Sequence, residues 1–253
     1  MKLFAAKGPP DRAQIDQTLK VLTADLVTAL GDDLVSLILY GDFVKESGFP
    51  VATGPINLML VLQQISCQRL DRVSPLIAKA ERTIPLATMT VTAEDIETSC
   101  DVFPIKFHDM QRYHRLLAGK DVLSNLEIAD DFLRLRCEQQ LKNLMIRLRA
   151  TYLHRNQSDS ALVETLCEAS NSFLRDISAC LFLKTGIVPE DECDLSEDFG
   201  REFEIDVSVM TEMLRLRDTR SVPDSKELRR VFDQFMKLVH DAALSIDEME
   251  SSS

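Results

Sequence analysis

Long apolar runs are missing from this sequence, and their absence limits where the protein can work. No segment approaches the roughly 18 consecutive apolar residues that a membrane-spanning helix needs. The apolar run near the N-terminus, Leu3–Ala6, is too short for the core of a signal peptide and ends at Gly8-Pro9-Pro10. We therefore expect a cytoplasmic protein with no membrane attachment.

Several motifs that mark common catalytic sites are also missing. None of the six cysteines forms a C-x-x-C pair, and the four histidines show no ligand spacing with them, so a zinc site is not expected. The G-x-S-x-G, Walker-type and G-x-G-x-x-G motifs are absent as well. We expect reduced, mostly buried thiols and neither a metal nor a cofactor.

Acidic residues dominate the charge that is present. The 253 residues carry a net charge of −12, which repels phosphate backbones and disfavours general nucleic-acid binding. Hydrophobic residues make up 45% of the chain, which is enough for a proper core. The length suits one large domain or two modest ones.

Periodicity in the first half predicts an α/β domain over residues 1–122. Apolar residues that recur every three or four positions from Ile15 to Leu30 predict a helix that stops at Gly31. A second helix is predicted over 69–82, with Pro75 as a kink or an end. Four runs predict strands, the first two buried and the last, which contains Pro104, at an edge: 34–40, 56–62, 86–92 and 102–107.

The second half, residues 123–253, predicts an all-helical bundle. Two long apolar stripes run from Leu133 to Leu148 and from Leu162 to Leu181. Six acids between residues 190 and 198 lack the pattern of a calcium loop and predict a solvated loop. A short helix is predicted over 206–217. The last helix is predicted to start at Asp224, and the acidic, Ser-rich tail after it is predicted to be disordered.

Two runs in the first half carry a resemblance to a known family. They read Leu37-Ile38-Leu39-Tyr40-Gly41-Asp42 and Gly54-Pro55-Ile56-Asn57-Leu58-Met59-Leu60-Val61-Leu62. A strand that ends in a glycine turn before a second strand resembles the core motif of the DNA polymerase beta-like nucleotidyltransferase superfamily. Segments 102–107 and 117–121 resemble bacterial members with a helical C-terminal domain. The resemblance covers residues 10–155 and implies a nucleotidyltransferase-like mixed sheet.

The catalysis that the resemblance implies does not fit the residues present. Family members hold two metal ions with an Asp-x-Asp pair, whose side chains alternate onto one face of the second strand. Pro55 and Asn57 stand at those two positions. Asp42 follows Gly41, at the position where the family has Ser or Gly. Lys106 stands where we look for the third carboxylate. We expect no catalytic residue and no metal ligand at these degenerate positions.

The leading hypothesis is a catalytically degenerate nucleotidyltransferase-like protein that acts by binding a nucleotide weakly or by binding a protein partner. The amphipathic surface of the helical half predicts a homo-oligomer. One alternative is an active nucleotidyltransferase with an atypical metal site, where Asp42 or Asp101 supplies ligands and Mg²⁺ enters with the nucleotide. Another is an unrelated α/β domain that matches the motif by accident.

Basic residues gather on the first helix of the second half. They are Arg134, Arg136, Lys142, Arg147, Arg149 and Arg155. Arg136, Arg147 and Arg149 are candidate contacts for a phosphate or an acidic partner. The alternative is a solvated helix face whose cations pair with nearby acids.

Histidines suggest little further chemistry. Arg149 and His154 resemble the Arg–His pattern of HEPN ribonucleases, so an RNA-cleaving helical domain is a remote alternative. His108 and His114 have no clear partner for acid–base work, and we expect both to be ordinary surface or interface residues.

Overall fold

The computed structural model describes residues 10–45, 54–219 and 221–249. The chain divides into two compact units. The first runs to Val102 and resumes over Lys106–Glu127, and the second comprises Phe103–Ile105 and the chain from Ile128 onward. The predicted loop around Gly48 and Pro50 and the Ser-rich end of the tail lie outside the described residues.

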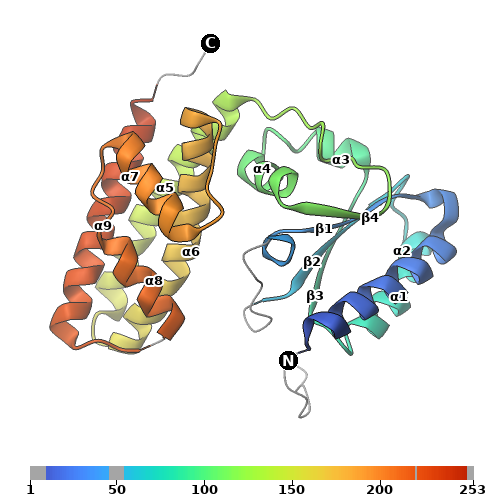
Figure 1. Ribbon diagram of the computed structural model, residues 1–253, viewed down its shortest axis with the longest axis horizontal. Helices are drawn as coiled ribbons and strands as arrows, with labels where there is room; N and C mark the ends of the chain where they lie inside the picture. The colour runs from blue at the N-terminus through green and yellow to red at the C-terminus, as the bar shows by residue number, and fades with distance from the viewer. Residues whose placement is uncertain (1–9, 46–53, 220, 250–253) are drawn as a thin grey trace. The chain divides into compact units, whose positions relative to one another are not determined.

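A four-stranded mixed sheet forms the centre of the first unit (Figure 1), with the strand order β3-β2-β1-β4. The strands are β1 (Leu34–Tyr40), β2 (Ile56–Leu62), β3 (Leu86–Val91) and β4 (His114–Gly119). β1 runs antiparallel to β2 and to β4, whereas β2 and β3 are parallel. The predicted strands at 34–40, 56–62 and 86–92 are therefore confirmed.

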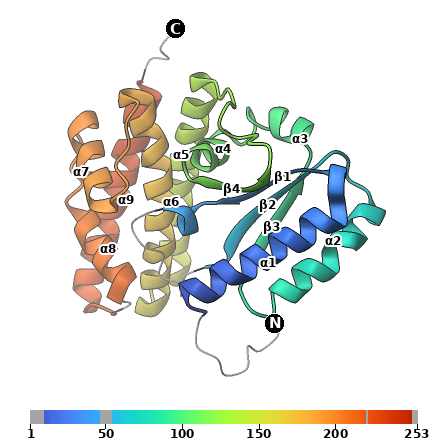
Figure 2. The same cartoon turned by 45° about the vertical axis from the view of Figure 1, so that its right-hand side comes forward.

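Two helices, α1 (Arg12–Leu30) and α2 (Cys67–Ala80), cover one face of this sheet (Figure 2). The apolar stripe of α1 is buried from Ile15 to Leu30, in one cluster with leucines of β1 and β2. Each fully buried Leu or Ile contributes about 1.5–3 kcal/mol, so the stripe explains why this helix docks on the sheet. Both predicted helices are confirmed, and α2 continues through Pro75.

The segment after β3 is helical, and the strand predicted over residues 102–107 was wrong. A short helix, α3 (Ala93–Glu97), is followed by α4 (Pro104–Arg112). Pro104 occupies the first position of α4, where the missing backbone N–H costs nothing and the fixed φ favours a helix. The edge strand is β4, which follows α4 and pairs with β1.

The second unit consists of helices over the residues described. These helices are α5 (Asp130–Arg155), α6 (Asp159–Thr185), α7 (Glu192–Phe203), α8 (Val209–Thr219) and α9 (Ser225–Asp247). Phe173 of α6 lies edge-on to Phe199 of α7 and to Phe235 of α9, with ring centroids 6.1 and 5.6 Å apart. Such aromatic pairs favour this geometry and tie three helices into one core. The predicted helical bundle is confirmed.

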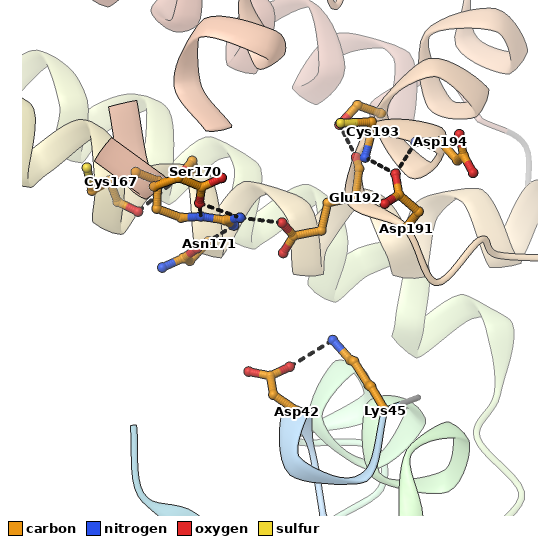
Figure 3. Close-up of polar contacts among 12 residues, drawn as sticks. Asp42, Lys45, Cys167, Ser170, Asn171, Asp191, Glu192, Cys193 and Asp194 are labelled. Atoms are coloured by element: carbon orange, nitrogen blue, oxygen red, sulfur yellow. Dashed lines mark hydrogen bonds and ion pairs between the residues drawn. The ribbon is translucent and has the colours of Figure 1, made fainter. Parts of the chain in front are cut away.

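The acidic segment at residues 190–198 was predicted to be a solvated loop, and this prediction was wrong. The segment forms the start of α7. Asp191 caps the helix, and its carboxylate accepts hydrogen bonds from the backbone N–H groups of Cys193 and Asp194 (Figure 3). Carboxylates near a helix N-terminus also interact favourably with the helix dipole. Glu192 then pairs with Arg217 of α8 at 2.5 Å. The acids therefore stabilise a helix end.

Two further expectations can be compared with the structure. All six cysteines are free, and four of them are buried, which confirms mostly buried thiols. Over the residues that the structure describes, none of the helices has both the length and the apolar character needed to cross a membrane.

Candidate functional site

The candidate site of the first unit begins where β1 ends. Gly41 follows Tyr40 with φ +80°, a conformation that other residues rarely adopt, and its N–H donates to the carbonyl of Tyr113 at 2.8 Å. A Cβ atom at this position would lie 3.2 Å from Nδ2 of Asn57. The glycine turn and the second strand therefore approach closely.

Asn57 lies on the sheet face opposite the leucine cluster. It is paired with Tyr40 of β1 and with Ala87 of β3, whereas Leu58 belongs to the buried cluster under α1 and α2. Neighbouring residues in register share a face, so the side chains beside Asn57 are a phenol and a methyl group. Pro55 precedes the strand and is exposed. This part of the sheet offers an amide where a metal pair needs carboxylates.

Asp42 is held in an ion pair directly after the glycine turn. Its carboxylate lies 2.8 Å from Nζ of Lys45 (Figure 3), and 80% of the Asp42 side chain is exposed. Burial lowers the pKa of Lys45, but the hydrogen bond to Asp42 and attraction from Asp42, Tyr113 and Asp109 outweigh it and raise the pKa overall. Lys45 is thus a stable cation whose charge is already partly neutralised.

Lys106 is not on a strand, so the reason for placing it at the third-carboxylate position fails. It is exposed on α4, and its Nζ lies 3.3 Å from Sδ of Met89 on β3. Across residues 10–45, 54–219 and 221–249, no three His, Cys, Asp or Glu side chains come together as they would around a metal ion. The residues at the motif positions do not fit a pair of magnesium ions.

We predicted that His108 and His114 are ordinary surface or interface residues, but His108 is buried and His114 is only partly exposed. His108 on α4 is only 3% exposed, and burial together with the nearby charge of Arg112 lowers its pKa to about 4. His114 begins β4, where its ring contacts the carbonyl of Gln111 at 3.0 Å and Asp121 at 3.1 Å. Both rings belong to the internal framework of the first unit, which a lone histidine in the sequence does not reveal.

The three candidate arginines of the second unit do not form one site. Arg136 donates to Gln139 at 2.6 Å, within its own helix. Arg147 lies eleven residues further along α5, about 16 Å away at 1.5 Å of rise per residue. Arg149 is exposed. Arg147 alone of the three lines a pocket of about 520 Å³ between α5 and α6.

That pocket also contains residues that the sequence reading did not select as a set. His154 and Arg155 line it beside Arg147, whereas Arg149 does not. The pairing of Arg149 with His154 that resembles HEPN ribonucleases is therefore not reproduced in this pocket. The signal was present in the sequence, because residues spaced by seven and eight positions share a helix face.

Together, the four-stranded sheet, its glycine turn and the helical second unit define a nucleotidyltransferase-like fold. Among solved structures, the chain is similar to spectinomycin adenyltransferase AAD(9) from Enterococcus faecialis, whose structure contains ATP and spectinomycin. The identity is 11% and the TM-score 0.53, over 91% of this chain and 100% of that chain. No protein-family model matches the sequence. No curated protein matches it either.

Proposed function

We propose that this protein is a catalytically degenerate nucleotidyltransferase-like protein that acts by binding, with a weakly held nucleotide or a protein as its partner. One observation carries the proposal: Asn57, a neutral amide, lies against the Gly41 turn where the second metal-binding carboxylate is expected. Transfer of a nucleotide by two metals needs carboxylates to hold and space the ions. The amide of Asn57 and the side chain of Pro55 carry no negative charge, so neither replaces a carboxylate.

The surroundings of the turn favour weak rather than tight nucleotide binding. The similar adenyltransferase has ATP in its structure, which makes nucleotides the first ligands to test here. Asp42 places a carboxylate beside the turn, and this charge repels a phosphate group. Lys45 offsets this only in part, because it is already paired with Asp42.

The proposal is tested by incubating the full chain with α-labelled ATP, GTP, CTP and UTP, Mg²⁺ and candidate protein, RNA and small-molecule acceptors. The proposal predicts no transfer of label. The active-enzyme alternative predicts transfer that is lost in Asp42→Asn or Asp101→Asn. Asp32→Asn is the matched control, because Asp32 is an exposed acid in the turn before β1. Any transfer by the wild-type chain contradicts the proposal, and transfer that survives only in wild type and Asp32→Asn supports the active-enzyme alternative.

A protein partner and self-association remain predictions. We predict that the chain forms a homo-oligomer through its helical unit. Sedimentation velocity at several concentrations measures the oligomeric state directly. A mass that stays that of the monomer up to high concentration contradicts this part of the proposal.

A further inference from the structure

The pocket between α5 and α6 is built by two facing stripes of polar side chains. On α5 the members of the stripe follow Arg147 by four, seven and eight residues. On α6 the members are separated from one another by three, four and seven residues, so each stripe lies on one face of its helix. Its principal polar members are Arg147, Thr151, His154, Arg155, Thr165 and Glu168. A volume of about 520 Å³ is in the range that holds a small metabolite.

The arginines of this pocket differ from several others in the same unit. Arg201, Arg217, Arg229 and Arg230 are all paired with carboxylates. Among the described residues, Arg147 and Arg155 make no such pair, although the protein carries a surplus of acids. Guanidinium groups bind phosphate with two parallel hydrogen bonds, so two unpaired arginines in one pocket suit a phosphate group.

The opposite wall of the pocket, on α6, offers hydrogen-bond acceptors rather than cations. Glu168 lines the pocket on α6 and repels a second negative charge, but its carboxylate accepts hydrogen bonds from hydroxyl groups. The hydroxyls of Thr165 and Ser172 donate to backbone carbonyls of their own helix, at 2.8 and 3.4 Å. Their oxygens therefore remain as acceptors toward the pocket. A ligand with a phosphate at one end and hydroxyl donors at the other matches both walls.

We propose that this pocket binds a small phosphorylated polyhydroxy compound, with Arg147 and Arg155 on the phosphate and Glu168 on the hydroxyl groups. His154 and Thr151 supply additional donors on the arginine side. The proposal does not depend on nucleotide binding by the first unit, because every residue involved belongs to the helical unit.

The test is calorimetric titration of the full chain with ribose 5-phosphate, inorganic phosphate and ribose as probes. We expect ribose 5-phosphate to bind most tightly and ribose to give no heat. Arg147→Ala and Arg155→Ala should each weaken binding of ribose 5-phosphate about tenfold or more, equivalent to about 1.4 kcal/mol. Glu168→Gln should weaken binding of ribose 5-phosphate while strengthening that of inorganic phosphate, because it removes a repulsive charge.

Arg149→Ala is the matched control, since this exposed arginine lies on the same helix but does not line the pocket. It should leave binding unchanged. An equal loss in Arg149→Ala overturns the proposal, because it shows attraction by diffuse charge. Absence of binding by both phosphate probes at millimolar concentration overturns it as well. So does tighter binding of single-stranded RNA that Arg147→Ala abolishes, since the pocket is then a nucleic-acid surface.

Discussion

At the scale of single residues, Gly41 is the position where backbone conformation and site geometry coincide. Its φ of +80° and ψ of −154° lie in a region nearly restricted to glycine, and a side chain would press on Asn57. We expect Gly41→Ala to lower the free energy of unfolding by about 1–3 kcal/mol in urea denaturation. Gly54→Ala is the control, because a Cβ there meets nothing within 4 Å. Equal losses in both variants contradict this account.

His108 makes stability depend on pH in a defined window. Its pKa is lowered from 6.5 to about 4 in the folded protein, so the unfolded chain binds the proton first as the pH falls. This contribution is fully present above pH 6.5 and is lost as the pH falls toward about 4, a difference of about 3 kcal/mol. His108→Gln should flatten stability across this window in urea titrations at several pH values. An unchanged slope in His108→Gln refutes the assignment.

Local sequence patterns predicted where the residues of the candidate site lie along the two strands, but not what surrounds them. Gly41 and Asn57 were placed correctly relative to the two strands, because a glycine between buried strands marks a turn and alternation fixes the faces. The burial of His108 and the pocket beside Arg147 depend on contacts between separate elements. Spacing along one helix shows which residues share a face, but it does not show what that face meets.

At the scale of elements, the N-terminus of α7 lies in the acidic segment that was predicted to be a loop, and its cap can be tested. Asp191 accepts two backbone hydrogen bonds there, whereas its neighbour Glu190 is exposed and outside the helix. We expect Asp191→Ala to destabilise the protein by about 1 kcal/mol, measured by thermal or urea unfolding. Glu190→Ala should change stability by less than about 0.5 kcal/mol. Similar effects of both substitutions contradict capping by Asp191.

Several elements were predicted correctly because each has a clear local pattern of apolar residues. The helices α1, α5 and α6 each bury an apolar stripe, and β1 and β2 are short apolar runs bounded by turns. Residues 102–107 were misread because Pro104 is equally compatible with an edge strand and with the first turn of a helix. The neighbouring residues in the sequence did not decide between the edge strand and the helix. In the structure, β4 pairs with β1 and takes the edge position instead.

At the scale of the whole molecule, the fold is what the chain shares with the similar adenyltransferase. The identity is 11%, so the likeness extends to the fold and not to the side chains of a site. A fold can host many functions, and the side chains at the site decide which of them remains. The proposal of binding without transfer rests on Pro55, Asn57 and the Asp42–Lys45 pair.

The most direct test of that central claim is calorimetric titration of the full chain with ATP, GTP, CTP and UTP, each with and without Mg²⁺. With no carboxylate pair at the motif positions to hold the ion, we predict that none of the four nucleotides requires Mg²⁺ for binding. Binding in the absence of Mg²⁺ supports a nucleotide-binding protein that has lost catalysis, and no binding supports a protein partner. Binding that requires Mg²⁺ contradicts the account, because other carboxylates must then rebuild the metal site.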